Sequence, residues 1–308
     1  MFRRTSPKAC RFCGAAFAMM LLAITAMGQS KDTILELDHV SICGSNLDTL
    51  RQTFTDVGLT PDFGGPHGNG VTQMAAVGFD DGTYIELIAP VKTGETSGSA
   101  WSRFMGEEAT TCAWAVGTNV LLQEVDRLKK AGIAVANPER GSRKRPDGMS
   151  VEWTTADVGS GTPGSLLPFV IEDETPRAWR VQTSASLQGA PVSGVENVVI
   201  GVSNLDAAVA MFRKAYGWAD PIVETQKDWG KMAYFPGEPV ILVSGAGWIS
   251  ERIAKFGESP VAFLLAGRDF PGAVKKYRLV GTKTWFGQKV AWFDPGKLKG
   301  VRLGVIGQ

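Results

Sequence analysis

The stretch "LDHVSICGSNLDTLRQTF" (37–54) decides the fold, because it returns without gaps as "VENVVIGVSNLDAAVAMF" (195–212). Each copy has the pattern of a strand, a polar turn "SNLD" and an amphipathic helix. Asn46 and Asn204 stand where a helix N-cap is expected, and each is followed two positions later by an aspartate in the first helical turn. The repeat predicts that one strand–helix unit occurs at least twice along the chain.

Two further copies extend this repeat, namely "CAWAVGTNVLLQEVDRLKKAGI" (112–133) and the weaker "VAFLLAGRDFPGAVKKYRLVG" (261–281). Each copy is followed by three more strand-like runs, which for the first copy are "GLTPDFG", "TQMAAVGF" and "TYIELIAP". The chain is therefore predicted to be an α+β protein of four βαβββ units. Because one such unit cannot bury its apolar face alone, the units are expected to pair into domains at 31–180 and 195–308, joined by a polar linker at 181–194.

The amino terminus has the pattern of an export signal. Four basic residues precede an apolar run at 12–27, and Ala26 and Gly28 supply small residues at a cleavage site. The run is shorter than the roughly 20 residues of a transmembrane helix. Residues 1–28 are therefore predicted to be a Sec-type signal peptide of a secreted or periplasmic protein with no membrane span after cleavage. An uncleaved anchor is the alternative.

The composition excludes some partners. The 308 residues carry a formal net charge of +1, with 44% hydrophobic and 20% charged residues, which is the balance of a globular protein. No basic field indicates a nucleic-acid partner. Two paired domains in one chain reduce the need for a dimer, so a monomer and a homodimer both remain open.

Three side chains stand out as candidates for chemistry. His39, one of two histidines in the chain, alternates with Leu35 and Leu37 on a strand face that would be buried. Glu86 lies within the apolar run "YIELIAP", and Glu172 directly follows another apolar run. A buried carboxylate is costly unless it is paired or bound to a metal. A core histidine and solvent-facing glutamates are the alternatives, but the two glutamates fall at matching places of the repeat, which favours a site.

At this point the sequence resembles the vicinal oxygen chelate superfamily, through "LDHV" at the start of a unit and "YIELIAP" in its fourth strand. "PFVIEDETPR", preceded by "GSRKRPDG", is similar to the glyoxalase-like domain proteins of that superfamily. The resemblance implies that two units curl around one divalent metal ion, Zn, Ni, Mn or Fe(II). Carried over by position, the metal ligands are His39, Glu86 and Glu172. Aligning Asn119 with Asn46 makes Cys112 a possible fourth ligand.

Cys43 and Cys112 are the two cysteines that would remain after signal cleavage. If the first strands of the two units cross near His39 and Cys112, then Cys43 lies roughly 13 Å away at about 3.3 Å per residue. Bridged cysteines need Cα atoms within about 7 Å of each other. A disulfide and a metal-bound thiolate remain alternatives, but two small, buried, unpaired cysteines are expected.

The second pair of units lacks these ligands, because Asn197 replaces the histidine and "PVILVSGAG" contains no acid. We expect residues 195–308 to form a degenerate domain that supports the fold or covers the substrate.

The ligand set and the resemblance together imply a metal-dependent lyase or isomerase that acts on a small oxygenated substrate, with Glu172 shuttling the proton. Extradiol dioxygenases of the superfamily use two histidines and a glutamate on iron. Only His67 could be the second histidine, and it lies in the glycine-rich "FGGPHGNG", where it is expected to edge the pocket. An iron-dependent dioxygenase is therefore less favoured.

The predicted substrate contacts are His67, Arg143, Arg145 and Trp153, since arginine binds carboxylate or enolate oxygens with two parallel hydrogen bonds. A solvated basic loop is the alternative for the two arginines. A non-catalytic protein that sequesters a small molecule is the competing function.

Overall fold

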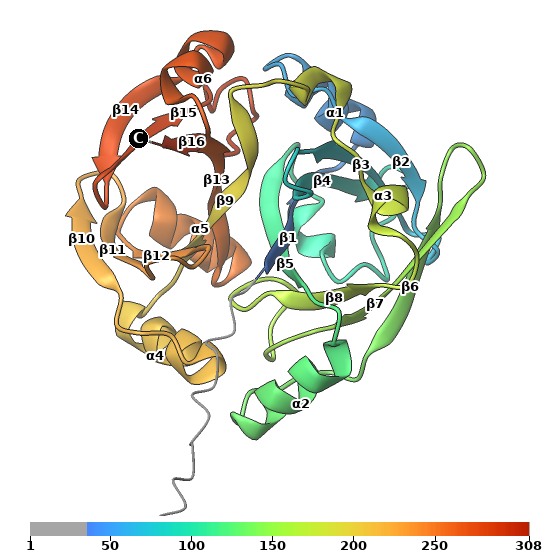
Figure 1. The fold of residues 1–308 in the computed structure, drawn as a ribbon, viewed down its shortest axis with the longest axis horizontal. Helices are drawn as coiled ribbons and strands as arrows, with labels where there is room; N and C mark the ends of the chain where they lie inside the picture. Colours follow the sequence, from blue (N-terminus) through green and yellow to red (C-terminus); the bar gives the residue numbers. More distant parts are fainter. Residues whose placement is uncertain (1–35, 308) are drawn as a thin grey trace, which may run out of the picture. The chain divides into compact units, whose positions relative to one another are not determined.

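The computed structural model describes residues 36–307, so the predicted signal peptide at 1–28 lies outside the described residues. These residues form two eight-stranded sheets with the same internal order (Figure 1). The first sheet runs β2-β3-β4-β1-β5-β8-β7-β6, and the second runs β10-β11-β12-β9-β13-β16-β15-β14. The predicted α+β fold of four βαβββ units in two pairs is confirmed.

The elements of the first pair of units are β1 (Glu36–Cys43), α1 (Leu47–Thr55), β2 (Asp62–Pro66), β3 (Thr72–Gly78), β4 (Tyr84–Pro90), η1 (Ser102–Phe104), β5 (Thr110–Gly117), α2 (Leu121–Lys130), β6 (Glu139–Lys144), β7 (Ser150–Ala156), β8 (Phe169–Asp173) and α3 (Arg177–Arg180). The second pair follows η2 (Ala185–Leu187) with β9 (Val192–Gly201), α4 (Leu205–Tyr216), β10 (Ile222–Gln226), β11 (Gly230–Tyr234), β12 (Val240–Ser244), α5 (Trp248–Phe256), β13 (Ser259–Gly267), α6 (Phe270–Tyr277), β14 (Val280–Trp285), β15 (Gln288–Trp292) and β16 (Leu303–Gly307).

The centre of each sheet is where two units join. The first strands of the two units pair antiparallel, β1 with β5 and β9 with β13. The fourth strand of each unit lies parallel to the first strand of the same unit, as β4 does to β1 and β8 to β5. First and fourth strands from both units therefore lie side by side at the middle of the sheet, and their inward side chains face one space.

The helix starts were largely predictable. The side chain of Asn46 accepts a hydrogen bond from the Thr49 amide at 2.9 Å, and Asn204 accepts one from the Ala207 amide at 3.0 Å. Both N-caps are confirmed. The helix α2 begins one residue later than the alignment assumed, with Val120 and not Asn119 at its N-cap. This shift moves the position equivalent to His39 from Cys112 to Ala113.

The two sheets share one hydrophobic core. A single cluster of buried side chains includes Leu50 of α1, Leu128 of α2, Phe212 of α4 and Phe270 of α6. The rings of Trp114 and Phe212 stack across the two halves with centroids 6.4 Å apart. Each fully buried side chain of this size stabilises the fold by about 1.5–3 kcal/mol. The two pairs of units therefore depend on each other for burial.

The predicted linker at 181–194 is anchored to the first sheet. Ser184 is 1% exposed; its hydroxyl accepts a hydrogen bond from the Gly78 amide at 3.1 Å and donates one to Asp62 at 2.6 Å. The last residues of the predicted linker already belong to β9, which begins at Val192. This segment therefore lies along the first sheet and is held to it by hydrogen bonds.

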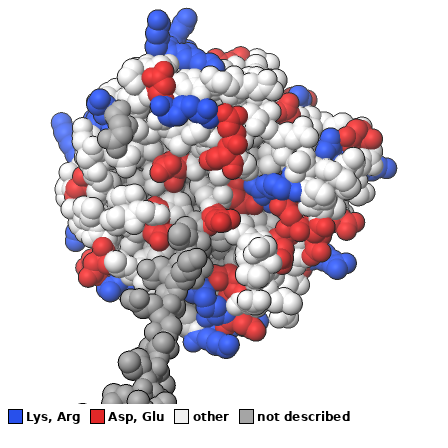
Figure 2. Space-filling view, in the orientation of Figure 1, with Lys and Arg blue, Asp and Glu red and all other residues white. Residues whose placement is uncertain are grey.

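The described surface agrees with the near-neutral composition. On the face of residues 36–307 that Figure 2 shows, acidic and basic side chains lie interspersed. Within the described part of the chain, no helix has the length and apolar character needed to cross a membrane.

Candidate functional site

The inner face of the first sheet surrounds a cavity of about 510 Å³, called here the site cavity. His39, Glu86, Arg143 and Trp153 line it, together with Trp101 from the connection between β4 and β5. A volume of this size falls within the range of small-molecule sites in proteins, roughly 300–1,000 Å³. With His67, which also lines it, five of the residues singled out in the sequence border one space.

Strand alternation and strand pairing place the first two of these groups together. On β1, Val40 and Ile42 point into the shared core, so His39 and Ser41 point inward. The parallel register sets Ser41 opposite Glu86, and the Ser41 hydroxyl donates to Glu86 Oε2 at 3.3 Å. His39 Nε2 lies 3.5 Å from the same oxygen. The sequence prediction that His39 and Glu86 lie close together in one site agrees with this geometry.

His67 joins them from the opposite edge of the sheet. Its amide donates to Thr72 O at 2.8 Å, and its backbone forms a bridge to Arg143 on β6. Gly65 permits this closure, because its φ is +101° and an added Cβ would lie 2.2 Å from Lys144 O. The result places His67 Nε2 at 3.3 Å from Glu86 Oε1. The "FGGPHGNG" segment is therefore an ordered strand end that delivers a second imidazole.

Each imidazole is oriented through its Nδ1 atom. His39 Nδ1 lies 2.5 Å from Asp38 Oδ1, and His67 Nδ1 lies 2.7 Å from the Thr72 hydroxyl. An ionised carboxylate only accepts hydrogen bonds, so His39 donates from Nδ1 to Asp38 and its Nε2 carries the free lone pair when the ring is neutral. Both Nε2 atoms face Glu86.

Asp38 is held ionised by arginines from the segment after β8. Arg180 donates to both carboxylate oxygens of Asp38, at 2.9 and 2.7 Å, and Arg177 donates to Oδ2. Burial raises the pKa of Asp38, but the charge of Arg180 and the hydrogen bond from His39 outweigh burial and hold this pKa well below its ordinary value. Asp38 is therefore a permanent acceptor for His39.

Arg180 also fixes the rest of this wall. It is 5% exposed and donates to both oxygens of Asp173, at 2.5 and 3.0 Å, and to the Tyr84 hydroxyl at 2.9 Å. Tyr84 in turn stacks on the His39 ring, with centroids 4.7 Å apart. The role of Arg180 was missed in the sequence, although it lies only three residues after "PFVIEDETPR", which carries the family resemblance.

The Glu86 carboxylate is ionised in this setting. Burial raises the pKa of Glu86, but the hydrogen bond from His67 and the charges of His39 and His67 outweigh burial and lower this pKa. With 8% of its surface exposed, Glu86 is a buried anion between two imidazoles.

The predicted third ligand lies elsewhere. On β8, Phe169 and Ile171 line the site cavity, so Glu172 points to the other face of the sheet. There its Oε2 accepts a hydrogen bond from the Leu121 amide at 3.3 Å, at the N-terminus of α2. The prediction that Glu172 is a metal ligand and the catalytic base is therefore wrong. The sequence showed that Glu172 ends an apolar run but did not show which face it occupies.

The predicted fourth ligand is also wrong, because Cys112 forms a disulfide with Cys43, with Cα atoms 5.8 Å apart. The two strands run antiparallel with His39 opposite Ala115, and the register shifts after Ser41. This register brings Cys112 next to Cys43 and not next to His39. The expectation of two unpaired cysteines fails for the same reason.

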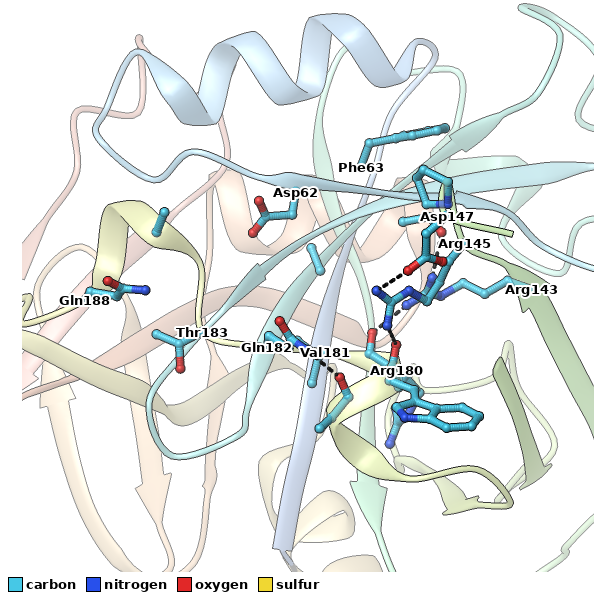
Figure 3. A pocket seen from close by; sticks show the side chains of 16 residues that line it. Asp62, Phe63, Arg143, Arg145, Asp147, Arg180, Val181, Gln182, Thr183 and Gln188 are labelled. Atoms are coloured by element: carbon cyan, nitrogen blue, oxygen red, sulfur yellow. Dashed lines mark hydrogen bonds and ion pairs between the residues drawn. The ribbon is translucent and has the colours of Figure 1, made fainter. Parts of the chain in front are cut away.

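Only one of the two predicted arginine contacts borders the site cavity. Arg143 is 6% exposed and lines both the site cavity and a second hollow beside it. Arg145 lies in this second hollow, of about 450 Å³, where it donates to Asp147 at 2.6 Å and to Trp179 O at 3.1 Å (Figure 3). Arg145 is therefore outside the space that His39 and Glu86 face, and its contact with a substrate stays a prediction.

Aromatic rings form the opposite wall of the site cavity. Trp153 meets His67 edge to face with centroids 6.2 Å apart, and Phe169 meets His39 in the same way at 5.4 Å. Trp101 lies against Phe169 and donates from its indole to Pro163 O at 3.0 Å. One side of the cavity is thus polar and charged, while the other is flat and apolar.

The donor types at the site fit a divalent metal. Among residues 36–307, no three His, Cys, Asp or Glu side chains already stand in a finished metal geometry. The two Nε2 atoms instead each pair with one oxygen of Glu86, at 3.5 and 3.3 Å. Neighbouring donors around a metal with bonds of about 2.1 Å are roughly 3.0–3.4 Å apart, so each imidazole stands near the distance from Glu86 expected of a neighbouring ligand. Two imidazoles and a carboxylate suit Zn, Ni, Mn or Fe(II).

Comparison with known proteins agrees with the fold. A family profile described as "Glyoxalase-like domain" matches residues 37–217, over half of the chain. A hypothetical protein from Staphylococcus aureus has a similar structure, with a TM-score of 0.59 and 15% identity over 88% of this chain and 99% of its own. A mutant of 4-hydroxymandelate synthase from Streptomyces coelicolor has a TM-score of 0.59 and 11% identity over 89% and 92%. At such identities the structures show a shared fold. No protein of curated function matches the sequence.

Proposed function

The chain belongs to the glyoxalase-like domain family of the vicinal oxygen chelate superfamily, and from that premise we propose that it is a metal-dependent lyase or isomerase acting on a small oxygenated molecule. His39, His67 and Glu86 would hold the single divalent ion. The observation that carries this proposal is the convergence of both Nε2 atoms on the two oxygens of Glu86, at 3.5 and 3.3 Å. When bound, the ion would polarise a substrate oxygen as a Lewis acid.

The surrounding residues have separate tasks in this proposal. Asp38 holds the His39 tautomer that presents the Nε2 lone pair to the cavity, as carboxylates beside metal-binding histidines commonly do. The rings of Trp101, Trp153 and Phe169 exclude water from one side of the substrate. These side chains bind and orient the substrate.

A carboxyl group other than Glu172 must carry the proton. Asp157 lines the site cavity, and burial first and the charge of Glu139 second raise its pKa above the ordinary value. A carboxyl group whose pKa is shifted toward neutrality is suited to accept and return a proton. Asp157 is therefore the group proposed to replace Glu172 in that role.

A second candidate function follows from His67. Two histidines and one carboxylate are the ligand set of non-haem Fe(II) oxygenases. The sequence argument against an iron dioxygenase was that His67, the only other histidine, lies in a glycine-rich loop expected to edge the pocket, and the position of His67 Nε2 beside Glu86 weakens that argument. Oxygen consumption by the Fe(II)-loaded protein with its substrate would favour the oxygenase. Turnover without oxygen would favour the lyase or isomerase.

Elemental analysis of the purified protein tests the metal site directly. The parent should hold about one equivalent of Zn, Ni, Mn or Fe, and the variants His39→Ala, His67→Ala and Glu86→Gln should each lose it. Glu172→Gln is the matched control and should keep the metal, because that side chain faces α2. A parent that takes up none of the four ions on incubation would refute the metal site and leave a small-molecule binding protein as the leading function.

Export is also proposed, with the signal peptide at 1–28. The disulfide between Cys43 and Cys112 supports it, because such bonds persist in oxidising compartments and are rare in the cytosol. Mass determination of the mature protein after secretion would test the cleavage before Gln29.

A further inference from the structure

Arg143 is a buried cation that forms no salt bridge with any described residue, although the negative charge of Glu86 acts on it from beyond salt-bridge distance. It is 6% exposed, and it donates two hydrogen bonds, to Gly64 O at 2.6 Å and to Arg180 O at 2.5 Å. Both acceptors are neutral carbonyl groups. Among residues 36–307 no carboxylate forms an ion pair with Arg143, and three of its five N–H groups have no protein acceptor.

Arg180, which also lines the site cavity, is a guanidinium whose hydrogen-bond donors are all used. It is equally buried, and all five of its N–H groups donate, to Asp38, Asp173 and the Tyr84 hydroxyl. Buried charges in proteins are normally paired, because an unpaired charge loses its solvation without compensation. Arg143 has no such ion pair where it borders the site cavity, and only two neutral carbonyl groups accept its hydrogen bonds.

The position of Arg143 suits a ligand that completes this pairing. The residue follows Ser142 on β6 and bridges to His67, so it lies on the polar side of the cavity. Trp153 and Phe169 supply the flat apolar side. A molecule that spans the cavity would meet a cation at one point and aromatic rings at another.

We propose that Arg143 anchors a carboxylate of the substrate, so that the substrate class is a small carboxylic acid with a flat apolar body. The planar guanidinium can give two parallel hydrogen bonds to a carboxylate. The apolar body lies against Trp153 and Phe169, and an oxygen group of the substrate faces His39 and Glu86. Only that last contact rests on the proposed function.

Binding of two matched probes tests the anchor. Phenylacetate and phenylacetamide have the same shape and differ in the charged group, and calorimetric titration of metal-free protein measures both. The parent should bind phenylacetate roughly tenfold or more tightly than phenylacetamide, because a hydrogen bond to a charged group is worth more than a neutral one. Arg143→Gln should abolish this preference.

Two more variants keep the test decisive. Arg268→Gln removes a surface arginine that pairs with Asp80 and should keep the full preference. Arg143→Lys retains a cation but loses the planar guanidinium, so the preference for phenylacetate should fall several-fold. If circular dichroism shows that Arg143→Gln does not fold, Arg143→Lys serves as the test variant in its place. A parent that binds the probes equally, or binds neither, would overturn the proposal, as would preference retained in Arg143→Gln.

The outcome is separable from that of the metal experiment. A preference for phenylacetate in protein that never takes up a metal would support the anchor and refute the proposed metal chemistry. A stoichiometric metal without any preference would do the opposite.

Discussion

The two sheets have the same strand order and different inner faces. In the first sheet, Ser41 pairs with Glu86 across β1 and β4; in the second sheet, the matching pair is Val199 and Ile241 across β9 and β12. Asn197 occupies the place of His39 by the same offset of the repeat. The same fold can therefore enclose a polar cavity in one sheet and packed apolar side chains in the other. This is possible because the shared core is formed by the outer faces of the two sheets, and the inner faces are free to differ.

Side chains from several segments fill the second sheet. Between β12 and β13 the chain forms α5, whose Ile249 is fully buried against Trp229 and the strands. Trp229 stacks on Trp292 and meets Trp248 and Trp285 edge to face, all with centroids within 5.0 Å. The matching connection of the first sheet buries Phe104 and Met105 beside the two cysteines, while its partly buried Trp101 borders the site cavity.

The most severe test of the comparison exchanges the matched residues. Ile241→Glu places a carboxylate at a position that is 1% exposed and surrounded by tryptophan rings, and it should lower the free energy of unfolding by roughly 4 kcal/mol or more. Glu86→Ile should cost clearly less, under about 2 kcal/mol, because residue 86 borders an existing cavity and not a packed cluster. Urea unfolding of metal-free protein measures both. Equal costs would show that the inner faces do not differ as described.

The next largest effect concerns the tryptophans. Trp229→Ala should cost about 3–5 kcal/mol, since it opens a cavity in a packed cluster. Trp153→Ala, at the rim of an existing cavity, should cost about 1 kcal/mol or less. Thermal unfolding gives both values. If Trp153→Ala proved the more destabilising change, the first inner face would have to be packed rather than hollow.

A smaller effect is expected at the bulge between the central strands. The first sheet has the Cys43–Cys112 disulfide there, whereas in the second sheet Gly201 lies against Val261 at the same register shift. Replacing both cysteines, as in Cys43→Ala with Cys112→Val, should lower stability by about 2–4 kcal/mol. Reducing agent should lower the melting temperature of the parent and leave the variant unchanged. A parent insensitive to reduction would count against a stabilising disulfide.

The smallest effect is expected at Asp157 in the cavity wall. Its pKa is raised by burial and by Glu139, so ionisation costs more in the folded than in the unfolded protein. That cost is present above the folded pKa and disappears as the pH falls below the unfolded pKa. Asp157→Asn should therefore stabilise the protein at pH 7 by a few tenths of a kcal/mol, screened by partial exposure, and the gain should vanish in acid. Unfolding curves of the parent and the variant at several pH values measure the difference. A variant that is less stable than the parent at pH 7 would contradict the prediction.

The sequence alone determined the repeat, the four units and both N-caps, because these features depend on local periodicity and on spacing within one unit. The joint placement of His39 and Glu86 was implied by the family resemblance, and the parallel register of β1 and β4 agrees with it. The predicted export stays a prediction, because residues 1–28 lie outside the described residues.

Only the tertiary structure decided which partners meet His39 and Glu86. The approach of His67 requires the edges of the sheet to close, the disulfide depends on the antiparallel register of β1 and β5, and the direction of Glu172 depends on the phase of β8. A shift of one residue in a strand reverses the face of every side chain on it. Contacts between segments far apart in the sequence decide which face each residue of a strand occupies. Neither the composition nor the local sequence pattern predicts this.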